Sequence, residues 1–241
     1  MSDSVKILRH DGVFHIEMAR PEKKNALTAD MYRAMADALT EAEADASMRA
    51  ILISGAGGQF TAGNDLADFM ATPPLDDTAP VFRFIDGLSR LKKPFVAAVE
   101  GVAVGVGTTM LLHCDLAYAG ASARFALPFA NLGLVPEAAS SLLLPLLAGH
   151  ARAAELLMLG EPFDAPTAQQ FGLLNAVVAD GQALEHALTR CRKLAAQPAA
   201  SIRLTKQLLK RSRQQLITET MHAEAEVFRE RLLSPEAKEA F

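Results

Sequence analysis

The chain has 241 residues, of which half are apolar, and a formal net charge of −4. This length and composition allow a sizeable core and exclude a globally disordered chain. The acidic balance, without a dense basic run, argues against nucleic acid as the main partner, and no apolar stretch is long enough to cross a bilayer. Cys114 and Cys191 lie far apart, which favours neither a disulfide framework nor a zinc site. We therefore expect a soluble cytoplasmic protein without a metal.

Short apolar strands alternate with helical segments through most of the chain. Asp11-Gly12 is a hairpin turn signal between strands at 5–8 and 13–18. Thr28 is placed to cap an amphipathic helix that runs to about residue 46. The next elements expected, in chain order, are a strand at 50–54, a glycine-rich loop at 55–63, an irregular mobile loop at 71–80, a helix at 81–91, a strand at 95–99, a helix at 108–114, strands at 116–119 and 124–126, and a helix that begins near 137.

From about residue 151 the pattern becomes helical, and residues 201–232 are typical of two helices rich in charged side chains. The repeated strand–loop–helix units before this point, with short and wholly apolar strands, favour a buried sheet with helices packed on it. We therefore predict an α/β protein with a core at residues 1–190 and an α-helical appendage at 191–241. Apolar positions of the appendage are expected to pack against a neighbouring subunit.

Two loops bring glycine and other small residues to a turn between an apolar strand and a helix. They are Phe60-Thr-Ala-Gly-Asn-Asp65 and Gly101-Val-Ala-Val-Gly-Val-Gly107. Such turns can direct bare backbone N–H groups at one oxygen atom, because no side chain blocks the approach. Two donors of this kind make an oxyanion hole, which serves reactions that place negative charge on a carbonyl oxygen.

A series of motifs in the same order along nearly the whole chain resembles the enoyl-CoA hydratase/isomerase (crotonase) superfamily. The resemblance implies a spiral core of ββα units with a C-terminal helical region, an acyl-CoA thioester ligand, and homotrimers or dimers of trimers. Coenzyme A would then be part of the substrate, and no separate cofactor is expected. The motifs are Arg20-Pro21, Lys24-Asn-Ala-Leu27, Phe60-Thr-Ala-Gly-Asn-Asp-Leu66, Lys92-Lys-Pro94, Gly101-Val-Ala-Val-Gly-Val-Gly107, Cys114-Asp115, Phe125-Ala-Leu-Pro128, Leu132-Gly-Leu-Val-Pro-Glu137 and Ala168-Gln-Gln-Phe-Gly-Leu173.

The resemblance also implies roles for individual residues. The backbone N–H groups of Ala62 and Val106 would form the oxyanion hole. Asp65 is also a candidate cap for the helix that follows it, while His113 and Asp115 are expected to make structural hydrogen bonds. The residues expected to contact the CoA ligand are Lys24, Ala26, Ala62, Gly63, Asp65, Leu66 and Lys93, with Lys23 and Lys92 as further basic candidates.

The acidic residues distinguish between the reactions of the family. Hydratases of this superfamily hold two glutamates, and here the matching positions are Thr109 and Phe129. Glu137 matches the catalytic glutamate of Δ3,Δ2-enoyl-CoA isomerases, in which one carboxylate moves a proton from C2 to C4 of a 3-enoyl thioester. The resemblance therefore favours this isomerisation, with Glu137 as the proton carrier.

Other interpretations stay open at this point. An acid after a proline also suits a helix N-terminus, where it interacts favourably with the helix dipole. The enzyme alternatives are hydration by an unusual route, ring isomerisation of an aryl-derived CoA thioester, and thioester hydrolysis. A third class is a protein that binds acyl-CoA without catalysis.

Overall fold

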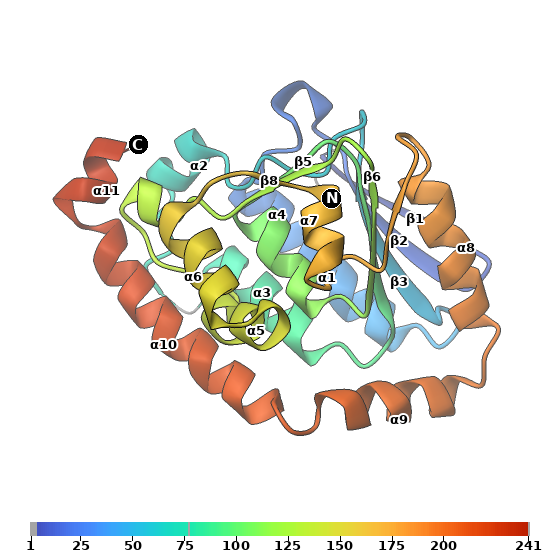
Figure 1. Ribbon diagram of the computed structural model, residues 1–241. Helices are drawn as coiled ribbons and strands as arrows, with labels where there is room; N and C mark the ends of the chain where they lie inside the picture. The colour runs from blue at the N-terminus through green and yellow to red at the C-terminus, as the bar shows by residue number, and fades with distance from the viewer. Residues whose placement is uncertain (1–3, 77, 241) are drawn as a thin grey trace.

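The computed structural model describes residues 4–76 and 78–240, and Figure 1 shows their arrangement. Two sheets form the framework: a six-stranded sheet in the order β1-β2-β3-β4-β6-β9 and a three-stranded sheet in the order β5-β7-β8. The strands are β1 (Val5–His10), β2 (Val13–Met18), β3 (Ala50–Gly55), β4 (Phe95–Val99), β5 (Val102–Val104), β6 (Leu116–Gly120), β7 (Arg124–Ala126), β8 (Phe163–Asp164) and β9 (Ala176–Val178).

Helices surround these sheets on several sides (Figure 1). The α-helices are α1 (Ala29–Ala44), α2 (Leu66–Ala71), α3 (Pro80–Arg90), α4 (Val106–Thr109), α5 (Ser140–Ala148), α6 (His150–Leu159), α7 (Ala165–Gln170), α8 (Ala183–Ala195), α9 (Ala199–Lys210), α10 (Gln214–Leu232) and α11 (Pro235–Ala240). Three short 3-10 helices are η1 (Pro21–Lys23), η2 (Met110–His113) and η3 (Ala130–Leu132).

β3 and β4, in the middle of the larger sheet, are covered on both faces, which explains their almost continuous apolar sequences. β1 and β2 form the antiparallel hairpin predicted from the sequence, and the pairings from β2 to β3, β4, β6 and β9 are parallel. Leu52 and Val96 face α8 and pack with Cys191 in a separate apolar cluster. Their neighbours Ile51 and Phe95 belong to the main core on the opposite face. Both faces of a parallel sheet are buried in this way, so its strands lack polar alternation.

The α/β organisation predicted from the sequence is confirmed, but several boundaries differ. The helix predicted at 108–114 is α4 followed by the tighter turn η2, and the helix expected near residue 137 begins only at Ser140. The stretch predicted as helical also contains β8 and β9. α8 spans the predicted boundary at residue 190 and packs on β3 and β4, so the helical region away from the sheet begins with α9.

The last three helices run around the body of the protein as an orange-to-red arm in Figure 1. α10 packs against α3 and α5 and buries Ile217, Met221 and Phe228 within the same chain. On the outer side of the arm, Leu204 and Leu208 are exposed. Within residues 4–76 and 78–240, no helix combines the length and the apolar character needed to span a membrane.

Candidate active site

A cavity of about 230 Å³ lies where the two glycine loops meet α2, α3 and α10. The described side chains around it are apolar except for those of Asn64 and Glu137. The aromatic part of the wall comes from Phe69, Phe82, Phe129 and Phe228, and Phe69 and Phe228 meet edge to face at 6.3 Å. Pro74, from the loop between α2 and α3, also lines this cavity.

The first glycine loop is fixed to the segment that precedes α1. Thr61 Oγ1 donates to the carbonyl of Asn25, and the Ala62 N–H donates to the carbonyl of Lys24 at 2.9 Å. Gly63 has a φ of +88°, and a Cβ at this position would lie 2.9 Å from the carbonyl oxygen of Val104. Only glycine suits this combination of positive φ and close approach. The path of the loop is therefore set by contacts that leave no room for a side chain.

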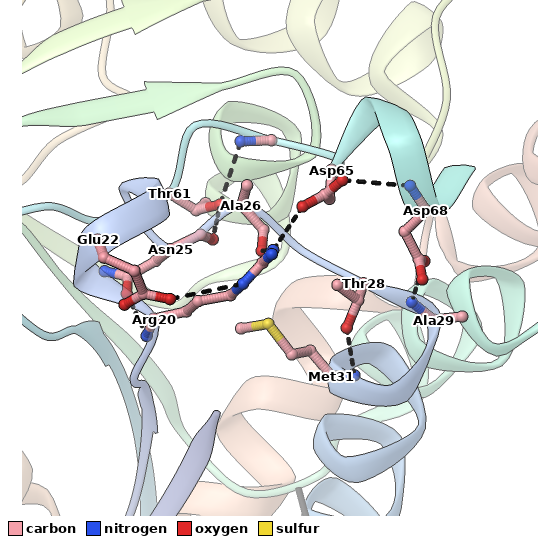
Figure 2. Close-up of polar contacts among 11 residues, drawn as sticks. Arg20, Glu22, Asn25, Ala26, Thr28, Ala29, Met31, Thr61, Asp65 and Asp68 are labelled. Atoms are coloured by element: carbon pink, nitrogen blue, oxygen red, sulfur yellow. Dashed lines mark hydrogen bonds and ion pairs between the residues drawn. The ribbon is translucent and has the colours of Figure 1, made fainter. Parts of the chain in front are cut away.

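An ion pair closes the same loop on its outer side (Figure 2). Arg20 donates to the carboxylate of Asp65 at 2.5 Å and to the carbonyl of Ala26 at 3.2 Å. The other oxygen of Asp65 accepts from the N–H of Asp68 and caps α2, as predicted. The hydrogen bond from Arg20 holds the pKa of Asp65 below its usual value. Asp65 is therefore engaged on both oxygens by the protein itself.

The backbone donors of the cavity differ from those expected. The N–H of Ala62 cannot serve an oxyanion, because it already donates to Lys24. Ala62 as oxyanion donor is thus a wrong prediction. Within the described part of the chain, the N–H of Asn64 has no hydrogen-bond acceptor, and Asn64 lines the cavity. Val106 is the first residue of α4, where an N–H has no intrahelical partner, and it lines the same cavity.

These two residues are held by their neighbours. The side chain of Asn64 accepts a hydrogen bond from the Tyr32 hydroxyl of α1, which fixes the side chain without engaging the N–H of Asn64. Val106 does not have a positive φ, so valine is compatible with the turn although Gly105 before it has a φ of +56°. Sequence reasoning missed Asn64 because motif spacing does not show which N–H of the loop is already bonded.

Glu137 contributes the only carboxyl group among the described residues that line the cavity. Glu137 lies in a turn before α5, and only 8% of the residue's surface is exposed. Thr109 Oγ1 donates to Oε1 at 2.5 Å, whereas Oε2 is buried without a hydrogen-bond partner among the described residues. Burial is the main cause that raises the pKa of Glu137 to about 8, and the nearby Glu224 adds to it. The carboxyl group is therefore protonated near neutral pH and can be ionised just above it.

The predicted CoA contacts fall into two groups. Ala62, Gly63 and Leu66 line the cavity. Lys24 is exposed, and its carbonyl group accepts the hydrogen bond from the N–H of Ala62. The carbonyl group of Ala26 accepts a hydrogen bond from Arg20.

Lys93 is contradicted as a CoA contact. Its ammonium group is buried and donates to the carbonyl groups of Ala42 at 2.5 Å and Asp45 at 2.6 Å. It precedes β4, whereas the glycine loops follow the carboxyl ends of β3 and β4. The side chain is thus committed to the opposite end of the sheet.

The two polar residues expected to have structural roles do so. Asp115 accepts from the N–H of Phe95 and from the ammonium group of Lys206. His113 bonds through Nε2 to the carbonyl of Ala138 at 2.7 Å, and burial lowers its pKa to about 4. In the described part of the chain, no group of three or more His, Cys, Asp or Glu residues is placed to hold a metal ion.

A buried carboxyl group that shares a cavity with backbone N–H groups from two glycine loops is the arrangement of an acid–base site for a carbonyl compound. The sequence profile described as enoyl-CoA hydratase/isomerase matches residues 9–241. The chain belongs to this family, the crotonase superfamily, whose enzymes act on acyl-CoA thioesters.

Related proteins carry several activities in their names. The chain is 38% identical to 1,2-epoxyphenylacetyl-CoA isomerase of Escherichia coli, over 84% of this chain and 81% of that protein. It is 34% identical to enoyl-CoA delta isomerase 2 of Rattus norvegicus over 98% of its own length, but spans only 61% of that relative. The solved structure of Pseudomonas aeruginosa OdaA is 45% identical, with a TM-score of 0.97 over 99% of this chain and 97% of that one.

Proposed function

We propose that the protein is a Δ3,Δ2-enoyl-CoA isomerase in which Glu137 carries a proton from C2 to C4 of a 3-enoyl thioester. The observation that supports this most strongly is the state of Glu137. Its carboxyl group is buried in an apolar cavity, bonded only through Oε1 among the described residues, and raised in pKa to about 8. A base with a pKa near the working pH can both take and return a proton.

The proposed reaction needs one acid–base group and one oxyanion site. The thioester carbonyl oxygen accepts hydrogen bonds from the N–H groups of Asn64 and Val106. The ionised Glu137 removes a proton from C2, and the electron pair of the broken C–H bond spreads over the dienolate, whose negative charge is largest on that oxygen. The protonated Glu137 then delivers its proton to C4. The product is the conjugated 2-enoyl thioester, and Glu137 is again a carboxylate.

The residues around Glu137 support isomerisation over hydration. Addition of water needs a second group that positions and activates the water molecule, and the two positions that hold glutamates in hydratases carry Thr109 and Phe129. Thr109 donates to Glu137, and Phe129 lines the cavity with an apolar ring. The apolar side chains exclude water, and no second acid–base residue in the described lining activates one, so the conjugated 2-enoyl product is not attacked by water at C3.

The remaining assignments follow from the family and from the surface of the chain. We propose that Lys24 contacts the CoA phosphates, while Ala26, Gly63 and Leu66 lie along the bound ligand. The subunits are proposed to form a homotrimer or a dimer of trimers, with the exposed leucines of α9 in the contact between them. The proposed location is the cytoplasm.

The first experiment separates isomerisation from the other reactions. Purified protein is incubated with 3-hexenoyl-CoA or 2-hexenoyl-CoA, the conjugated enoyl absorbance is followed, and the products are identified by mass. We expect the absorbance to rise with the first substrate and no hydrated product from the second. Glu137→Gln should lose about 10²–10⁴-fold in kcat, whereas Glu226→Gln, an exposed position on α10, should not. Hydration of 2-hexenoyl-CoA would overturn the proposal, and tight binding without turnover would indicate a non-catalytic protein.

Ring isomerisation is a second candidate, favoured by the Escherichia coli relative, named 1,2-epoxyphenylacetyl-CoA isomerase. The aromatic wall of the cavity is compatible with a flat ring next to the thioester. The direct test is turnover of 1,2-epoxyphenylacetyl-CoA beside 3-hexenoyl-CoA. A kcat/KM at least tenfold higher for the epoxide would replace the first proposal with this one.

A further inference from the structure

The turn that carries Glu137 has an unusual backbone. Ala138 and Ala139, the two residues after Glu137, both adopt the left-handed conformation, with φ values of +58° and +55°. Residues with a Cβ seldom adopt this conformation, because the Cβ crowds the following carbonyl group, and two in succession are rarer still. The turn therefore depends on outside contacts, and such strain often gathers at functional sites.

One buried carboxyl group on α10 supplies most of these contacts. Glu224 Oε2 accepts from the N–H of Ala139 at 2.6 Å. Its Oε1 accepts from both the N–H and the hydroxyl of Ser141, at 2.9 Å and 2.5 Å. From the other side, His113 holds the carbonyl of Ala138. Glu224 thus binds the backbone at the second residue of the strained pair and just after it.

We propose that Glu224 is a positioning residue for the reaction, whose carboxylate clamps the 138–141 turn and so holds the Glu137 carboxyl group against Thr109 and beside the N–H groups of Asn64 and Val106. This inference rests on the proposed function of Glu137. Glu224 does not line the cavity with the glycine loops, so it acts through the turn and not on the substrate. The alternative is a purely structural role, in which Glu224 only caps the N-terminus of α5 and stabilises the fold.

The charge of Glu224 also reaches Glu137. It is one of two causes that raise the pKa of Glu137, the larger being burial. Tyr32 of α1 also interacts with Glu137, and burial raises the pKa of Tyr32 well above its usual value. A second cavity, of about 460 Å³, is also lined by Glu137. The other charged or titratable residues that line it are Arg83, Asp86, Arg90, His222 and Glu224. Arg83 is paired with Asp37 and Arg90 with Asp86.

The positioning role predicts a change that a purely structural role does not. Glu224→Gln keeps the shape and one acceptor but turns an NH₂ group toward a backbone or hydroxyl donor. We expect kcat for 3-hexenoyl-CoA to fall by about 10- to 100-fold, as for other small misplacements of reacting groups, with KM changed less than about threefold. The pH midpoint of kcat/KM should also move to lower pH, because a negative charge near Glu137 is lost. Glu226→Gln, the same change at an exposed position of α10, should alter none of these values.

A rescue variant tests the turn directly. Glycine adopts the left-handed conformation without strain, so adding Ala139→Gly to Glu224→Gln should restore kcat by at least about fivefold. The folded state of every variant is checked by circular dichroism and thermal unfolding. A Glu224→Gln protein that unfolds at lower temperature but keeps its kcat and pH midpoint would overturn the proposal. So would a double variant that gains stability but no activity.

A readout without turnover separates this inference from the proposed function. The infrared band of the protonated Glu137 carboxyl, assigned by its loss in Glu137→Gln, can be followed against pH in the free protein. If the wild type does not isomerise 3-hexenoyl-CoA, the proposed function fails on its own. The position of Glu137 is then still judged by this band, whose midpoint and frequency should change in Glu224→Gln. An unchanged band would overturn the positioning role.

Discussion

Replacing Glu137 by glutamine should change how the stability of the protein depends on pH. The pKa of this carboxyl group is about 8 in the folded protein, against a usual value of 4.5, chiefly because of burial. The folded state therefore binds the proton more tightly than the unfolded state. The stability that this proton contributes is complete below about pH 4.5 and is lost as the pH rises through about 8.

The size of the effect follows from the same two values. Between them, the folded state holds one proton more than the unfolded state, so the wild type loses about 1.4 kcal/mol of unfolding free energy for each pH unit. The rise in pKa from 4.5 to about 8 then corresponds to at most about 5 kcal/mol. Glutamine cannot ionise and lacks this dependence.

Urea unfolding of the wild type and of Glu137→Gln at intervals from pH 5 to pH 9 measures the difference. The unfolding free energy of the variant minus that of the wild type should rise with pH by roughly 2–5 kcal/mol over this range. Glu226→Gln, at an exposed site, should show a nearly constant difference. A flat or falling difference for Glu137→Gln would mean that its carboxyl group ionises in contact with water, and the dry-cavity reasoning would be refuted.

Two further substitutions test the N–H donor of Val106 and the ion pair between Lys206 and Asp115. Val106→Pro removes one N–H at the first position of a helix, where proline fits, so kcat should fall by about 10²–10³-fold. Val106→Ala keeps the N–H, and its kcat should stay within a few fold of the wild-type value. An equal loss of kcat in both variants would assign the effect to the side chain. Lys206→Met removes a buried ammonium group that donates to the carbonyl of Lys93 and to the solvent-accessible carboxylate of Asp115. The unfolding free energy in urea titrations should therefore drop by about 1 kcal/mol, and an unchanged value would refute this contribution.

Much of the fold could be predicted because its signals are local. Asp11-Gly12 marks the β1–β2 hairpin, and Thr28 caps α1 through a hydrogen bond from the N–H of Met31, as expected. β8 and β9 could not be found, because strands of two and three residues carry too little pattern. The start of α5 was misplaced because the left-handed pair Ala138 and Ala139 depends on Glu224, a contact that is remote in the sequence.

In the candidate site, too, local motifs could be read from the sequence, whereas contacts between remote residues could not. The motif singled out Glu137, which lies in the cavity, but Ala62 was preferred to Asn64 because only the fold shows that the Ala62 N–H is bonded to Lys24. Lys93 looked like a surface cation in the sequence, yet two backbone carbonyl groups hold it inside.

Glu224 was missed altogether, although the sequence does carry a signal for it. On α10 it falls on the buried stripe, whose other members are Ile217, Met221, Phe228 and Leu232. A carboxylate on such an apolar stripe needs buried partners, and this spacing could have marked it.

The contribution of α10 to the cavity separates the formation of the two sheets from the completion of the cavity. Every strand of both sheets and the two glycine loops precede this helix in the chain. The sheets and both glycine loops can therefore form before α10 packs against them. The strained turn would lack its clamp and the cavity one wall until then. The cavity and the turn at 138–141 are thus completed only when α10 packs on α3 and α5.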